Sequence, residues 1–129
     1  MAVTHSTAAR NAATDAVTAL IGASGKLAFH TSGTVSAPGT VVATLSLSAT
    51  AFAASASGTA TANAITSDTN ATGNATAVST ATLQTSGGTV VIHCAVAASA
   101  SDINMSNGLT VNAGDTVSCS SLTYTALSA

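Results

Sequence analysis

Histidine and cysteine are the first side chains to consider for metal binding or nucleophilic catalysis. The chain has three histidines and two cysteines: His5, His30, His93, Cys94 and Cys119. Zinc ligands recur at short, regular spacings, and these histidines lie far apart. A strand through residues 93 and 94 would point the two side chains to opposite faces. We therefore expect structural histidines and no bound metal.

The segment DINMSNG, residues 102–108, resembles the start of a calcium-binding loop, because Asp102, Asn104 and Ser106 alternate. Such a loop needs glycine at position six and a bidentate Glu at position twelve. Here the glycine falls at position seven, and Ala113 occupies position twelve. We interpret the segment as a turn.

Acid–base chemistry also has few candidates. The chain has no Glu, and its four Asp are scattered. Ser and Thr are so frequent that a Ser/His/Asp combination is expected by chance. The run Gly22-Ala-Ser24-Gly25 is one residue short of a nucleophile elbow, and no glycine-rich phosphate loop occurs. These residues predict that the protein is not an enzyme and uses no cofactor.

Charge excludes two classes of partner. Only 5% of the 129 residues are charged, the net charge is −2, and two residues are basic. Binding to nucleic acid or to an anionic membrane surface requires clustered Lys and Arg. No apolar run is long enough to span a membrane, and MAVTHSTAAR does not look like a secretory signal. We expect synthesis in a cytoplasm with both cysteines reduced; a disulfide formed later, outside the cell, is the alternative.

The first 25 residues differ in character from the rest. Residues 4–21 predict a helix, with Thr4 or Ser6 as its N-cap. Its packing stripe is expected to consist of Ala9, Ala12, Ala13, Ala16, Val17, Leu20 and Ile21. Arg10, Asn11, Asp15 and Thr18 would then face largely away from the body. We predict an arm and helix in residues 1–25 and a β-sandwich domain in residues 26–129.

Alternation of apolar and polar residues predicts about seven or eight short strands after residue 25. The expected strands are 26–31, 40–48, 59–65, 76–84 and 89–97, a hairpin over 104–112 at Asn107-Gly108, and a last strand within 112–126. In the second strand, Val41, Ala43, Leu45 and Leu47 should face inward. The last strand changes phase between Cys119 and Leu122, which a bulge near Ser120-Ser121 would explain. The pattern predicts a mainly β fold: an antiparallel sandwich or small barrel with one N-terminal α-helix.

Edge strands normally carry charge, which prevents sheets from pairing edge to edge. This chain has almost no charge available for that purpose. We therefore infer that its edges are covered by partner subunits or by a larger assembly.

Five segments are similar to one family: MAVTHSTAARNAATDAV, KLAFHTSG, VATLSLSATAF, TANAITSDTNATG and AGDTVSCSSLTYTA. They resemble small virion proteins encoded among the structural genes of tailed bacteriophages. The best-fitting role in such a family is a capsid decoration, or cement, protein. The resemblance implies a β-rich homotrimer that binds the lattice of the major capsid protein on the outer surface of the virion. It also implies that the protein braces the shell against internal DNA pressure.

The resemblance leaves alternatives open. A tail or fibre component, or a module that binds the host surface, would also suit strands rich in Thr, Ser, Ala and Gly. The candidate residues for contact with the capsid or a neighbouring subunit are in the N-terminal arm: Val3, Thr4, His5 and Arg10. The competing interpretation is an ordinary chain terminus followed by the start of a helix.

Overall fold

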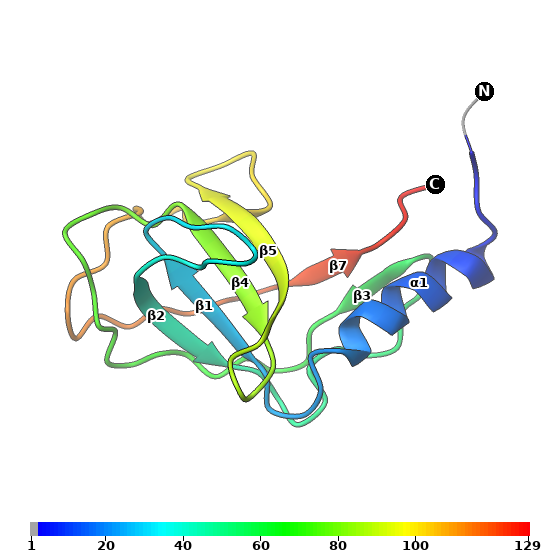
Figure 1. The fold of residues 1–129 in the computed structure, drawn as a ribbon, viewed down its shortest axis with the longest axis horizontal. Coiled ribbons are helices and arrows are strands. Elements are labelled where there is room, and N and C mark those ends of the chain that lie inside the picture. Colours follow the sequence, from blue (N-terminus) through cyan, green and yellow to red (C-terminus); the bar gives the residue numbers. More distant parts are fainter. Residues whose placement is uncertain (1–2) are drawn as a thin grey trace.

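The computed structural model describes residues 3–129 and confirms a mainly β fold with one N-terminal helix (Figure 1). Its elements are α1 (Thr7–Ala19), β1 (Lys26–His30), β2 (Val41–Ser46), β3 (Thr59–Thr61), β4 (Thr80–Gln84), β5 (Val90–Ala97), β6 (Ile103–Asn104) and β7 (Thr123–Thr125). A curled sheet has the strand order β2-β1-β4-β5-β6, and β3 pairs with β7 in a second, small sheet. Pairing is antiparallel except between β5 and β6, which are parallel. A sandwich or half-open barrel describes this arrangement.

The core lies on one face of the curled sheet, where apolar residues of neighbouring strands are opposite one another. Leu27 of β1 pairs with Leu45 of β2 on one side and with Leu83 of β4 on the other. All three side chains are buried, as is Phe29, two residues further along β1. Each large side chain that is buried in this way contributes about 1.5–3 kcal/mol to folding. Alternation predicted these strands, although Ala28 and His30 on the other face of β1 are buried as well.

The phase of β2 differs from the prediction at its first residue. Val41 is 40% exposed and Val42 is fully buried, the reverse of the expected pattern. The register between β1 and β2 shifts between Phe29 and His30, so one extra residue is accommodated in β2. Such a bulge reverses the facing of the residues beyond it, and strict alternation cannot reveal it.

Helix α1 begins where expected but docks through the opposite face. Ser6 is the N-cap, and its hydroxyl accepts a hydrogen bond from the Ala9 amide at 3.2 Å. The only buried helical residue is Thr14, while Ala12, Ala16 and Leu20 of the predicted packing stripe are exposed. The predicted stripe is therefore wrong for these residues, whereas Ile21 is buried as predicted and Ala13 and Val17 are half-buried.

Polar groups fix the helix instead. The Thr14 hydroxyl donates to the Gly58 carbonyl at 2.6 Å and accepts from the Ala126 amide at 3.1 Å. The Asn11 side chain accepts from the Gly58 amide at 2.7 Å, and the Asp15 carboxylate accepts from the Ser55 amide at 2.9 Å. The turn that leads into β3 is therefore held by one polar face of the helix. Gly58 suits this turn because its φ of 82° favours glycine and because a Cβ there would meet the Arg10 side chain.

The predicted hairpin at Asn107-Gly108 does not form. Ile103 and Asn104 pair in parallel with Val96 and Ala97 of β5, so β6 joins the sheet before the turn. After the turn, the Leu109 carbonyl accepts from the Val78 amide at 2.8 Å. The turn connects two segments with different partners, because an Asn-Gly pair favours a local reversal and does not choose what pairs beyond it.

The last predicted strand is two separate pieces, and no bulge accounts for its change of phase. Val117 forms a bridge with Asp68, whereas Thr123–Thr125 pairs with β3. The chain passes from one sheet to the other between these two points, so the inward face changes. The predicted strand over residues 59–65 is likewise shorter, because only Thr59–Thr61 forms a strand.

Candidate functional site

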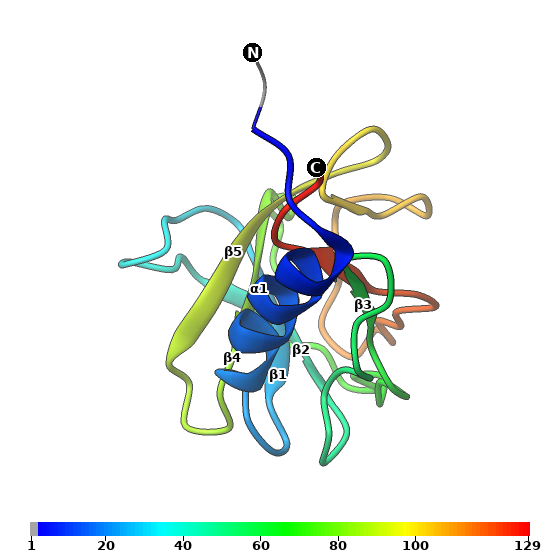
Figure 2. The ribbon, with the colours of Figure 1, turned by 90° about the vertical axis from the view of Figure 1, so that its right-hand side faces the viewer.

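The four candidate contact residues occupy an extended arm and the first turns of α1. Val3, Thr4 and His5 precede the helix, and Val3 is 77% exposed. Both ribbon views show the arm running away from the body (Figures 1 and 2). Among residues 3–129, no backbone hydrogen bond is made by residues 3, 4 or 5.

His5 and Arg10 both contact the C-terminal tail of their own chain. The His5 Nδ1 lies 2.7 Å from the Ala129 oxygen, and the Arg10 Nε donates to the Leu127 carbonyl at 3.1 Å. These two candidates are thus brought together at the tail. Val3 and Thr4 remain free for another molecule within the part of the chain that the structure describes.

A second surface, one that the sequence did not single out, is the outer edge of β5, residues 90–94. β6 pairs only with Val96 and Ala97, and the Asp102 carboxylate accepts from the Ala95 amide at 2.9 Å. Across residues 3–129, no other segment forms backbone hydrogen bonds with this outer edge. We call residues 90–94 the open edge. β5 runs along one side of the body (Figure 2).

The direction of the backbone groups follows from the ladder. The Val96 amide donates to the Ser79 carbonyl at 3.0 Å, and hydrogen-bonded pairs alternate along an antiparallel ladder. Cys94 opposite Ala81 is therefore a bonded pair, and His93 opposite Thr82 is not. The N–H and C=O of His93 consequently point outward. The open edge contains no charged residue or proline, although the register shift between Leu83 and Gln84 leaves Val91 as an extra residue in β5, and such a bulge is one of the usual devices against pairing.

A network of hydrogen-bonded side chains connects β1 and β4. The His30 Nδ1 lies 2.9 Å from the Gly39 carbonyl, which only accepts, so this nitrogen carries the proton. In the neutral ring, Nε2 then accepts from the Thr82 hydroxyl at 2.8 Å, and the Gln84 amide donates to Thr82 at 2.8 Å. Both ring nitrogens of His30 therefore have hydrogen-bond partners within the chain. The Nε2 of His93 is buried without a hydrogen-bond partner in the described part of the chain.

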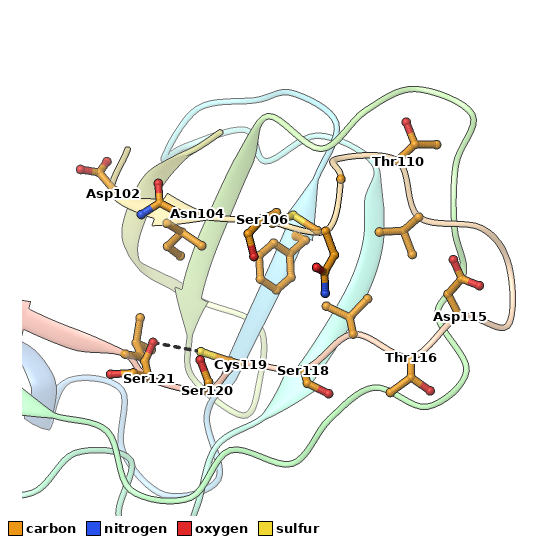
Figure 3. A pocket seen from close by; sticks show the side chains of 18 of the residues that line it. Asp102, Asn104, Ser106, Thr110, Asp115, Thr116, Ser118, Cys119, Ser120 and Ser121 are labelled. Atoms are coloured by element: carbon orange, nitrogen blue, oxygen red, sulfur yellow. Dashed lines mark hydrogen bonds between the residues drawn. The ribbon is translucent and has the colours of Figure 1, made fainter. Parts of the chain in front are cut away.

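An open cleft of about 780 Å³ has Phe29 among its lining residues. Asp102, Asn104 and Ser106 lie on one wall, and residues 118–121 lie on the other (Figure 3). Asp102 and Asp115 lie at opposite ends of the cleft, so the two carboxylates cannot act on one atom (Figure 3). No group of three or more His, Cys, Asp or Glu side chains suited to a metal occurs in residues 3–129.

Both cysteines are free thiols. Burial, and secondly the Asp102 carboxylate, raises the pKa of Cys94 to about 11. Burial also raises the pKa of Cys119, whose thiol donates to the Ser121 carbonyl at 3.3 Å (Figure 3). A raised pKa removes the thiolate, which is the nucleophilic form. Neither thiol is therefore activated for catalysis.

Five of the six charged side chains form hydrogen bonds, and each of them bonds to backbone groups of its own chain. Besides Asp15 and Asp102, the Asp68 carboxylate accepts from the Thr44 and Asn70 amides, and the Asp115 carboxylate accepts from the Asn112 amide. Arg10 donates to the tail, and the sixth charged residue, Lys26, begins β1. Asp102 and Asp115 remain exposed, and the other four charged residues are half-buried.

Within residues 3–129, no helix is both long and apolar enough to cross a bilayer. No protein-family model, curated protein or solved structure matches this chain.

Proposed function

We propose that this chain is a structural virion protein that decorates a bacteriophage capsid and stabilises it by binding the lattice of the major capsid protein as a homotrimer. The observation that carries the proposal is the use of charge. Five of the six charged side chains bind backbone groups of their own chain, so they fix loops, and the surface carries little charge because only 5% of the residues are charged. Permanent interfaces are depleted of charge in the same way.

The exposed features suit a docked module. Helix α1 turns alanines and Leu20, which is 66% exposed, toward solvent, and the arm and the open edge offer unpaired backbone. A monomer that stayed free in solution would be expected to protect such features with charge. The resemblance of the sequence to small virion proteins supports the capsid as the partner.

Counting copies on purified particles tests this proposal. Quantitative mass spectrometry should find the chain in a copy number comparable to that of the major capsid protein, and imaging should place it on the outer shell. Particles made without the chain should lose DNA at a lower temperature, and adding purified chain should restore their stability. A few copies per particle, located at the tail, would contradict capsid decoration and favour a tail or fibre component.

A further inference from the structure

We propose that the N-terminal arm of one copy pairs as an added strand with the open edge of β5 in a neighbouring copy. This pairing deepens the proposed function, because it names the contact that would hold the homotrimer together. The arm and the open edge are different surfaces, so the contact is head-to-tail, and a head-to-tail contact that closes forms a ring.

Both halves of the contact lack backbone partners. Val3, Thr4 and His5 make no backbone hydrogen bonds within residues 3–129, and Ser6 continues the arm in an extended conformation with ψ of 158°. On the open edge, the N–H and C=O of His93 point away from β4. An extended segment laid beside this edge would satisfy both sets of groups, which is the usual basis of strand addition.

The two segments also agree in length. At about 3.3 Å per residue, the four residues from Val3 to Ser6 span about 13 Å, and the five residues of the open edge span about 16 Å. The Asp102 carboxylate occupies the Ala95 amide, so the open edge ends there. Neither segment carries Asp, Glu, Lys or Arg, and no like charges oppose the pairing.

The arm of the same chain does not supply this strand. It leaves the body in both views, and its last residues are fixed at the C-terminal tail through the His5 contact with Ala129 (Figures 1 and 2). Neither surface gives up a backbone hydrogen bond when the arm of one copy pairs with the open edge of another.

The first test is the mass of the purified full chain in solution. Sedimentation should give about three times the 12.2 kDa chain mass. Deleting residues 1–5 should give monomers with unchanged circular dichroism. His93→Pro should also give monomers, because proline removes only an outward amide, whereas His93→Ala should keep the oligomer. A wild-type chain that is monomeric at every soluble concentration would overturn the proposal.

Cross-linking tests the contact directly, even if His93→Pro fails to fold. In a Cys94→Ser, Cys119→Ser background, a Val3→Cys chain is mixed with a differently tagged chain carrying Thr89→Cys or Ala95→Cys. Copper–phenanthroline takes two electrons and two protons from the paired thiols to form one disulfide. Thr89 and Ala95 flank the open edge at its two ends. Only one of these two positions should link to Val3→Cys, and that position gives the direction of the added strand. Val35→Cys, 55% exposed on another loop, is the matched control and should not link.

Equal linking to Val35→Cys, or none to either edge position, would overturn the pairing. The outcome is independent of the particle experiment. A chain that is abundant on the shell but does not exchange arms in solution would contradict this inference and leave capsid decoration in place.

Discussion

Single charged side chains in this protein hold backbone segments in place through hydrogen bonds. Asp68 is the clearest example, because its carboxylate accepts from the Thr44 amide of β2 at 2.9 Å and from the Asn70 amide at 3.0 Å. A carboxylate that binds amide groups makes charge-assisted hydrogen bonds, which are stronger than neutral ones. The four Asp that looked scattered in the sequence therefore share a structural role. That role could not be predicted, since it depends on which loops meet.

Cys94 gives a prediction at the scale of one residue. With a pKa of about 11 in place of 9.0, its thiolate fraction at about pH 8 should be roughly 100-fold lower than in an unfolded peptide. Iodoacetamide should therefore alkylate Cys94 of the native Cys119→Ser chain correspondingly slowly, as measured by mass spectrometry. Asp102→Asn should speed the reaction, because it removes the negative charge that helps to raise the pKa. Equal rates in native and unfolded chains would contradict this account.

The same pKa shift links Cys94 to stability with a definite sign. The thiol ionises more easily in the unfolded chain, so its contribution to the free energy of unfolding is present below pH 9 and is lost as the pH rises through about 11. Replacing Cys94 with Ser should remove this part of the pH dependence. Urea unfolding of both chains over that pH range measures the difference.

At the scale of elements, the helix shows how far sequence patterns reach. The presence of α1 could be predicted, with Ser6 as one of two N-cap candidates, because both depend on neighbouring residues, although Thr7–Ala19 is shorter than the predicted range of residues 4–21. Its docking face could not, because Thr14 finds Gly58 and Ala126, partners that lie 44 and 112 residues away. The strands β1, β2, β4 and β5 followed from alternation, but the parallel pairing of β6 and the open edge of β5 depend on distant segments.

Thr14→Val tests the polar docking of the helix. The valine would leave the Gly58 carbonyl and the Ala126 amide without their partner, at a cost of about 1–3 kcal/mol for each buried group. We expect the free energy of unfolding to fall by about 2–4 kcal/mol in urea titrations. Thr7→Val, the same change at an exposed position of the same helix, should alter stability by less than about 0.5 kcal/mol. A Thr14→Val chain as stable as Thr7→Val would show that the helix docks by other contacts.

At the scale of the whole molecule, most charged side chains bind backbone groups of their own chain. Screening by salt weakens attractions between exposed charges, and this protein relies on few of them. The melting temperature should therefore change by less than about 3 °C between about 0.05 and about 1 M NaCl. Scanning calorimetry measures this directly. A marked fall at high salt would show that ion pairs contribute to stability.

The contacts between the two ends of the chain also set an order of folding. Helix α1 binds Ala126 and Leu127, and His5 contacts Ala129, so the helix gains these partners only after the β-strands between them have been synthesised. Contacts across such sequence separations form slowly. A nascent chain on the ribosome would hold β1 and β2 ready to pair while its helix still lacked its tail contacts. Docking of residues 126–129 against the helix would then be a late step of folding, so the finished surface would form only after the sheet strands have paired.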